Sequence, residues 1–205
     1  IDAAVAIQAM LTLVEPQSSG IGGGAFMLYW DNKNKKLHTF DGRETAPQKA
    51  TPYIFLDDGE PMRWIDAVVG GKAIGVPGVL KALEMAHKEF GKLKWRDLFE
   101  DAITTSRQGF IVSPRLDSLL KLDIHPGLNN FVTSQNYFKP NGEPLEQGTL
   151  QKNQLLANAL LNIAHHGTDY FYKGELAEKI AEAARTTIIN PGFMTADDLA
   201  LYEAK

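Results

Sequence analysis

The chain has 205 residues, of which 44% are hydrophobic and 22% are charged, a composition that suits a globular body with a sizeable core. A formal net charge of −4, without any basic run, argues against nucleic acid or an anionic membrane surface as a partner. The chain has no cysteine, which excludes disulfides and a thiol nucleophile. Its longest apolar stretches, such as residues 21–30, are too short and glycine-rich to span a bilayer, so we expect no membrane span.

The first forty residues predict a helix followed by a β-hairpin. Apolar side chains occupy nearly every face of residues 1–14, which predicts a buried helix that ends at Pro16. A glycine-dense turn, residues 20–24, follows. Residues 25–30 are short, apolar and rich in aromatic side chains, which is typical of a buried strand. After a polar turn, residues 37–40 predict the returning strand of the hairpin.

Helices dominate the rest of the chain. Proline in a first turn, serine or threonine as N-cap and glycine after the last turn mark their ends. These signals predict helices over residues 79–90, 95–108, 150–164 and 175–185, one that opens at Ser113-Pro114, and one that opens at Thr195. Residues 123–149 are rich in glycine, proline and asparagine and predict a long loop. A hairpin followed by helices predicts an α+β fold with part of the sheet missing.

The glycine turn matches a dinucleotide-binding fingerprint in residue spacing but not in its structural context. Gly20-x-Gly22-x-x-Ala25 has the right spacing, but that motif needs a strand before it and a helix after it. Here a helix precedes the glycines and a strand follows them. The pattern therefore indicates a turn that needs positive φ or a close approach of the backbone.

A serine–lysine pattern and the histidines give equally weak signals. Ser118-x-x-Lys121 resembles part of the signature of penicillin-recognising enzymes, but the lysine–threonine–glycine element is absent, so an exposed helix face is the better interpretation. His165 and His166 are adjacent and point about 100° apart on a helix, which disfavours a shared metal. We expect no metal site, no cofactor and no nucleophile in this chain.

Arg43 and Glu44 are the strongest candidate functional residues. Arg43 directly follows the predicted hairpin, and an arginine on such a rigid scaffold can grip a carboxylate bidentately. The alternative is a surface ion pair at a strand end, which is the commoner outcome for an Arg-Glu dipeptide. The residues by themselves leave both interpretations open.

Several separate segments of the chain match the pattern of one known family, and they occur in that family's order. They are residues 2–6, residues 15–28, Arg43-Glu44-x-Ala46-Pro47, Gly75-Val76-Pro77-Gly78, residues 102–112, Phe171-Tyr172-Lys173-Gly174 and residues 194–202. From one end to the other, the chain thus resembles the large subunit of the γ-glutamyltranspeptidases.

The resemblance implies an N-terminal-nucleophile (Ntn) hydrolase, a four-layer αββα sandwich of which this chain is a part, mostly helices plus a buried β-hairpin. A proenzyme would cleave itself, and the N-terminal threonine of the small subunit would attack glutathione or a related γ-glutamyl amide, with its own amine as base. The γ-glutamyl group would then pass to water or to an amino acid. The family also implies a periplasmic or secreted protein.

In this picture Arg43 binds the α-carboxylate of the γ-glutamyl group, and Glu44 orients Arg43. Residues 1–205 would form a partial large-subunit domain, truncated at both ends and inactive alone, because the catalytic threonine lies outside them. Alternatives remain open. They are a cephalosporin (glutaryl) acylase, a relative that processes poly-γ-glutamate, and a non-catalytic assembly module.

Overall fold

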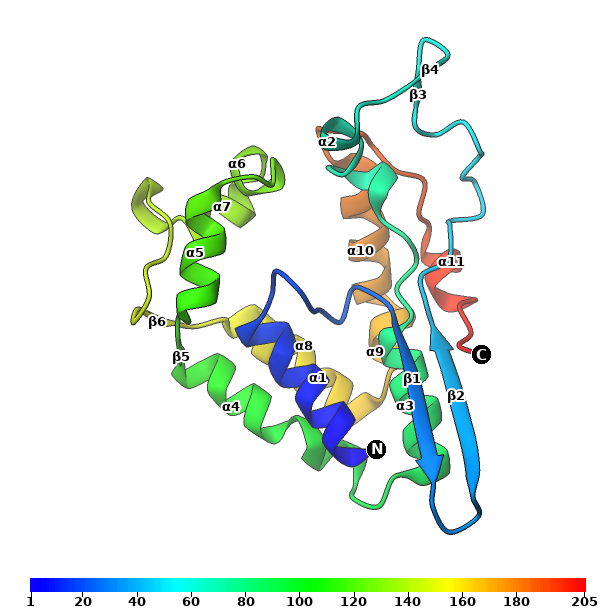
Figure 1. Cartoon of the computed structure of the whole chain (residues 1–205). Coiled ribbons are helices and arrows are strands. Elements are labelled where there is room, and N and C mark those ends of the chain that lie inside the picture. The colour runs from blue at the N-terminus through cyan, green and yellow to red at the C-terminus, as the bar shows by residue number, and fades with distance from the viewer.

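Helices form the bulk of the structure, a computed structural model that describes residues 1–205 (Figure 1). The α-helices are α1 (Asp2–Val14), α2 (Trp64–Ala67), α3 (Val79–Phe90), α4 (Glu100–Gln108), α5 (Pro114–Leu122), α6 (Gly127–Asn130), α7 (Val132–Phe138), α8 (Gln154–His166), α9 (Asp169–Tyr172), α10 (Glu175–Thr186) and α11 (Ala196–Ala200). The 3-10 helices are η1 (Gly71–Ala73), η2 (Trp95–Phe99) and η3 (Pro140–Gly142).

The strands form three separate antiparallel pairs. They are β1 (Ala25–Asp31) with β2 (Lys36–Gly42), β3 (Leu56–Asp57) with β4 (Glu60–Pro61), and β5 (Phe110–Ile111) with β6 (Leu150–Gln151). Only the first pair is long. Its register places Ala25 opposite Gly42, so the hairpin ends where the candidate residues Arg43 and Glu44 begin. The α+β fold predicted from the sequence is confirmed.

A helical core supports one face of this hairpin. Its largest buried side chains include those from η2, α3, α8 and α9, and helix α10 joins them through three buried alanines, Ala177, Ala181 and Ala184. The buried Tyr172 hydroxyl donates a hydrogen bond of 2.9 Å to the carbonyl of Pro77, just before α3. Helix α3 lies along β1 and β2, so the core holds the hairpin from that side only (Figure 1).

The prediction of a buried hairpin is wrong for one of its faces. Side chains alternate along β1, and Phe26 and Leu28 are 68% and 71% exposed. A continuous apolar run suggested burial on both sides, as in a covered sheet. Within this chain, however, α3 covers one side, and the opposite side is an apolar surface open to solvent.

Three further predictions need correction. Helix α1 is buried along one stripe, Val5, Ala9 and Leu13, rather than on every face. Residues 123–149 are not a loop but contain α6, α7 and η3, whose helical turns the glycines and asparagines obscured. The helix predicted from residue 150 begins at Gln154, because residues 150–151 pair with β5 instead.

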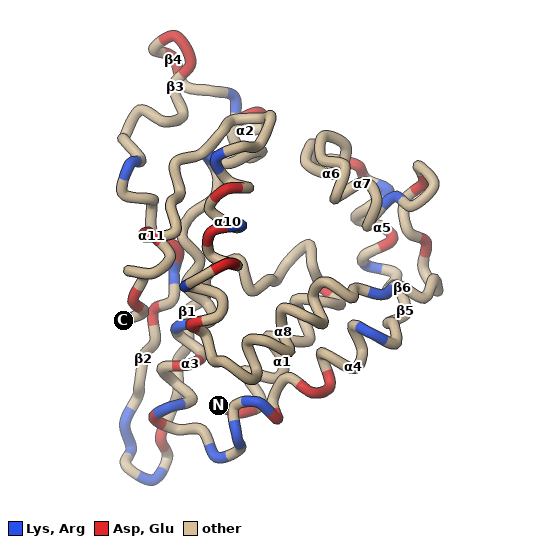
Figure 2. The backbone as a smooth tube through the Cα atoms, turned by 180° about the vertical axis from the view of Figure 1, so that it is seen from behind, with Lys and Arg blue, Asp and Glu red and all other residues tan.

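Charges of both signs are interspersed along the chain, as Figure 2 shows. Several of them form pairs within one helix, such as Lys179 with Glu175 on α10 and Lys88 with Glu84 on α3. Such exposed pairs contribute little stability each. No helix combines the length and the apolarity needed to cross a membrane.

Core packing around α8 can be tested with two leucines of that helix. Leu160 is fully buried, whereas Leu155 is 82% exposed. We expect Leu160→Ala to lower the free energy of unfolding by about 2–5 kcal/mol, because it leaves a cavity in the core. Leu155→Ala, the matched control, should change it by less than about 0.5 kcal/mol. Urea unfolding followed by circular dichroism measures both, and equal losses would contradict the assigned core.

Candidate functional site

Arg43 and Glu44 lie where the chain leaves β2 and runs beside the segment before α3. Thr45 and Val76 pair as an isolated antiparallel bridge, with N–H to carbonyl distances of 3.3 and 2.8 Å. The Arg43 N–H donates to Asp41 Oδ1 at 2.9 Å, which closes a tight local turn. The backbone that carries the candidate pair is therefore fixed on both sides.

Tyr202 holds the backbone of Arg43 from the far end of the chain. Its hydroxyl donates a 2.7 Å hydrogen bond to the Arg43 carbonyl. Burial, together with the Asp41 and Glu44 carboxylates, raises the pKa of Tyr202, so this hydroxyl keeps its proton at neutral pH. The contact requires Gly78, because a Cβ there would collide with the Tyr202 hydroxyl and with the carbonyl of Gly42.

Two further contacts tie the same segment to the C-terminal residues. The N–H of Gln48 donates to Asp198 Oδ1 at 2.9 Å, and Asp198 also completes the capping box of α11 with Thr195. Asp41 and Lys205 exchange backbone hydrogen bonds of 2.6 and 2.9 Å. In Figure 1 the chain end accordingly lies beside the end of β2.

The glycine turn encloses the carboxylate of Glu44. A Cβ on Gly24 would lie 2.5 Å from Glu44 Oε2, and one on Gly75 would lie 2.8 Å from the Glu44 Cβ. The Gly23 carbonyl accepts hydrogen bonds from the N–H groups of Gly78 and Val79 at the start of α3. Of the two reasons predicted for these glycines, close approach is confirmed, while no residue of the turn has a positive φ.

Arg43 and Glu44 form a half-open ion pair. Arg43 Nη1 lies 3.2 Å from Glu44 Oε2, and the side chains are 56% and 27% exposed. The buried Oε2 atom has no hydrogen-bond donor, so the pair is held by charge rather than by a well-directed hydrogen bond. The Arg43 guanidinium also lies 5.8 Å from the ring centre of Phe26, within the range of a cation–π contact.

A cavity of about 380 Å³ opens at this pair. It is lined by backbone and side chains from two segments, residues 43–55 and residues 72–75. The lining residues are Arg43, Glu44, Thr45, Ala46, Pro47, Ala50, Ile54, Phe55, Lys72, Ala73, Ile74 and Gly75. A cationic fork at the edge of such a cavity is suited to binding a carboxylate.

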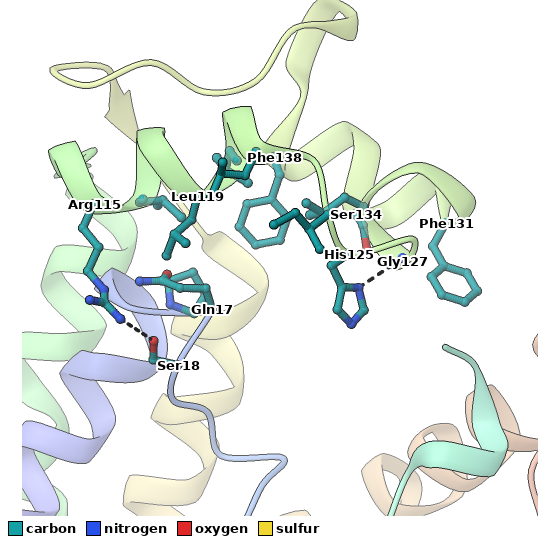
Figure 3. Close-up of a pocket in the computed structure, with 15 residues that line it drawn as sticks. Gln17, Ser18, Arg115, Leu119, His125, Gly127, Phe131, Ser134 and Phe138 are labelled. Atoms are coloured by element: carbon teal, nitrogen blue, oxygen red, sulfur yellow. Dashed lines mark hydrogen bonds between the residues drawn. The ribbon is translucent and has the colours of Figure 1, made fainter. Parts of the chain in front are cut away.

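A larger cavity of about 650 Å³ lies between residues 16–18 and the helices α5 to α7 (Figure 3). Eight of its fifteen lining residues are hydrophobic, and all of these but one are leucine or phenylalanine. Several of its polar groups have local partners: Arg115 contacts Ser18 at 3.4 Å, and His125 Nδ1 accepts the N–H of Gly127 at 3.1 Å. It offers no grouped acid, base or nucleophile, so the Arg43 cavity is the better functional candidate.

The rejected sequence motifs do not assemble into sites. Lys121 pairs with Asp117 at 2.8 Å, on the same helix. The rings of His165 and His166 are 6.5 Å apart, and no group of three or more metal-ligating side chains occurs.

Sequence reasoning missed the residues that position Arg43. The sequence predicts the helix that opens at Thr195, and the structure confirms Thr195 as its N-cap, with Asp198 completing a capping box. That Asp198 also binds Gln48, 150 residues away, has no local signal. The same holds for Tyr202 and for Lys72, which joins the cavity through a contact between distant segments.

Known proteins share both the fold and the sequence. A family model described as gamma-glutamyltranspeptidase matches residues 1–205. A glutathione hydrolase proenzyme from Bacillus subtilis (strain 168) is 39% identical over 204 residues, which cover 99% of this chain. A gamma-glutamyltranspeptidase from Pseudomonas nitroreducens, solved in complex with L-DON, matches with a TM-score of 0.89 and 35% identity over 100% of this chain and 58% of that one. A cephalosporin acylase from Bacillus halodurans matches with a TM-score of 0.79 and 28% identity over 100% of this chain and 38% of that one.

These matches define the architecture as an α+β part of an Ntn hydrolase. The chain belongs to the γ-glutamyltranspeptidase family. It spans 34% of the length of the Bacillus subtilis relative, about a third of that protein.

The close packing of Gly24 against Glu44, which we call the glycine cradle, can be tested by adding one methyl group. Gly24→Ala places a Cβ against Glu44 Oε2 and the Gly42 carbonyl, so we expect a loss of about 1–3 kcal/mol in the free energy of unfolding. Gly22→Ala is the matched control, because a Cβ there meets nothing within 4 Å. Thermal and urea unfolding give both values. The cradle would be refuted if the two variants behaved alike.

Asp198 gives the segment a pH-dependent anchor. Burial opposes its ionisation, but hydrogen bonds from the Gln48 N–H and from Thr195 prevail and hold the pKa of Asp198 below its ordinary value. Its stabilisation is therefore full above the unfolded pKa of about 3.9 and is lost as the pH falls through the lower folded value. We expect Asp198→Asn to destabilise the protein by about 1–2 kcal/mol at pH 7 and by less below about pH 3. Asp197→Asn, on the exposed side of the same turn, is the control, and a pH-independent difference would contradict the assignment.

Proposed function

We propose that this chain is part of the large subunit of a γ-glutamyltransferase that acts on glutathione and related γ-glutamyl amides. The observation that carries the proposal is Arg43, a cation at the edge of a cavity on a backbone fixed by Tyr202 and the Thr45–Val76 bridge. The names of its relatives, glutathione hydrolase and gamma-glutamyltranspeptidase, supply the substrate class.

In the proposed mechanism Arg43 binds the α-carboxylate of the γ-glutamyl group and thereby places the γ-carbonyl for attack. This is binding and orientation, and it contributes by making the reaction effectively intramolecular. Glu44 orients the guanidinium of Arg43. Its carboxylate lies against Gly24, its Cβ lies against Gly75, and its Oε2 atom lies 3.2 Å from Arg43 Nη1.

Bond-making belongs to a residue outside this chain. The proposed nucleophile is the N-terminal threonine of a small subunit, whose hydroxyl attacks the γ-carbonyl while its own amine takes the proton. The γ-glutamyl group then passes to water or to an amino acid. Residues 1–205 by themselves should hydrolyse no γ-glutamyl amide.

The open face of the hairpin supports such a partner subunit. Phe26, Leu28 and Trp30 present a row of apolar side chains to solvent next to the site. Apolar surfaces of this kind are normally covered by another element or chain. A small subunit packed there would lie on the side of the hairpin on which Phe26 contacts Arg43.

A comparison of γ-glutamyl and glutaryl substrates distinguishes the proposed γ-glutamyltransferase from the acylase alternative. A glutaryl group is a γ-glutamyl group without its α-amine, and it keeps a carboxylate at the same distance from the acyl carbonyl. Arg43 could therefore bind either group, and discrimination between them falls to residues outside this chain that bind the α-amine. The full-length enzyme should cleave a γ-glutamyl anilide in preference to the matched glutaryl anilide. The reverse preference would favour the acylase, whose structural likeness motivates the comparison.

Arg43→Ala in the full-length enzyme should raise KM for a γ-glutamyl anilide by roughly 10²-fold or more, with a smaller effect on kcat, because a charge-assisted binding contact is lost. Arg43→Lys should also bind poorly, since a lysine cannot reproduce the planar fork. Arg63→Ala is the control, because that guanidinium pairs with Asp66 and lies outside the cavity. Steady-state kinetics decide the point, and an unaltered KM in Arg43→Ala would refute the role.

A further inference from the structure

The cavity at Arg43 contains a second cation, Lys72. Its side chain is half-buried and lines the same space as Arg43 and Glu44. The Lys72 ammonium forms no ion pair within the chain. Because Glu44 already offsets the charge of Arg43, the uncompensated positive charge of the cavity is that of Lys72.

The backbone beneath Lys72 is clamped. The Lys72 N–H donates to the Asn190 carbonyl at 2.8 Å, and the Asn190 side chain donates to the carbonyls of Asp66 and Val69, also at 2.8 Å. Gly71 is pressed so closely against the end of α10 that a Cβ would collide with the Ala184 carbonyl. A charged side chain on such a fixed backbone is well placed to bind a ligand.

Lys72 and Arg43 reach the cavity from two different segments of the chain. Thr45 and Val76 are partners in the isolated bridge. Arg43 precedes Thr45 along the chain, and Lys72 precedes Val76. Because the bridge is antiparallel, residues that precede it on the two strands extend in opposite directions. A ligand that contacts both cations would therefore carry two separate anionic groups.

We propose that Lys72 binds a second carboxylate, on the leaving-group side of the substrate, and so favours γ-glutamyl compounds whose leaving group is anionic. γ-Glutamyl peptides with a free C-terminal carboxylate belong to this class. This inference rests on the proposed function, since it takes Arg43 as the residue that binds the α-carboxylate at the other end. The contact selects among substrates and takes no part in bond-making.

The test uses two γ-glutamyl anilides that differ only in a carboxylate on the aromatic ring, with the full-length processed enzyme. The measured quantity is the ratio of kcat/KM for the carboxylated anilide to kcat/KM for the neutral one. Lys72→Gln should lower this ratio by roughly fivefold, as expected for a partly exposed ion pair, mainly through KM. Lys72→Arg keeps the charge and should keep most of the preference. Lys72→Met, a second neutral variant, repeats the measurement independently.

Lys49→Gln is the matched control, because Lys49 is an exposed lysine of the neighbouring segment that does not line the cavity. It removes the same charge and should leave the ratio as in the parent enzyme, which separates local binding from long-range attraction. A ratio that stays constant in both Lys72→Gln and Lys72→Met overturns the inference, while the cleavage of both anilides still supports the proposed function. Failure of the parent enzyme to cleave either anilide overturns the proposed function itself.

Discussion

The hydrogen bond from the Tyr202 hydroxyl to the Arg43 carbonyl is the constraint on which the site depends. It joins the end of the hairpin to residues near the far end of the chain, and it passes over Gly78, where a side chain would block it. Asp198 and Lys205 fix Gln48 and Asp41 in the same way. The position of Arg43 is thus set by tertiary contacts on both sides, and not by the hairpin alone.

The electrostatics of the site follow from this rigid frame. Glu44 is enclosed by Gly24 and Gly75 and cannot turn away from Arg43, so one buried carboxylate oxygen remains without a hydrogen-bond donor. The Glu44 Oε2 atom attracts the guanidinium of Arg43 by charge but makes no hydrogen bond with it. The N–H donors of Arg43 therefore stay free to bind another carboxylate. Arg43 is consequently held but still half-exposed, which is the state that the proposed binding of an incoming carboxylate requires.

Local signals in the sequence predicted the elements well wherever a physical cause acted locally. Ser113 and Thr195 cap the helices that they open, and the polar turn closes the hairpin. The predictions failed where burial depends on distant elements. The alternation of exposed and covered side chains on β1 could not be read from its uniformly apolar sequence, because it depends on which side α3 covers. Likewise Arg43 was found from its motif, but Lys72 and Tyr202 reach the site only through folding.

The open hairpin face lies next to the candidate site and is the surface on which the proposed partner subunit would pack. Phe26 belongs to that face and also contacts the guanidinium of Arg43, so a chain that covered the face would exclude water from one side of the Arg43 cation. Excluding water strengthens the attraction between a guanidinium and a carboxylate. In the proposed function, Arg43 would therefore bind its carboxylate most strongly once the subunit that carries the nucleophile covers this face. Substrate binding would then depend on assembly through one aromatic side chain, Phe26.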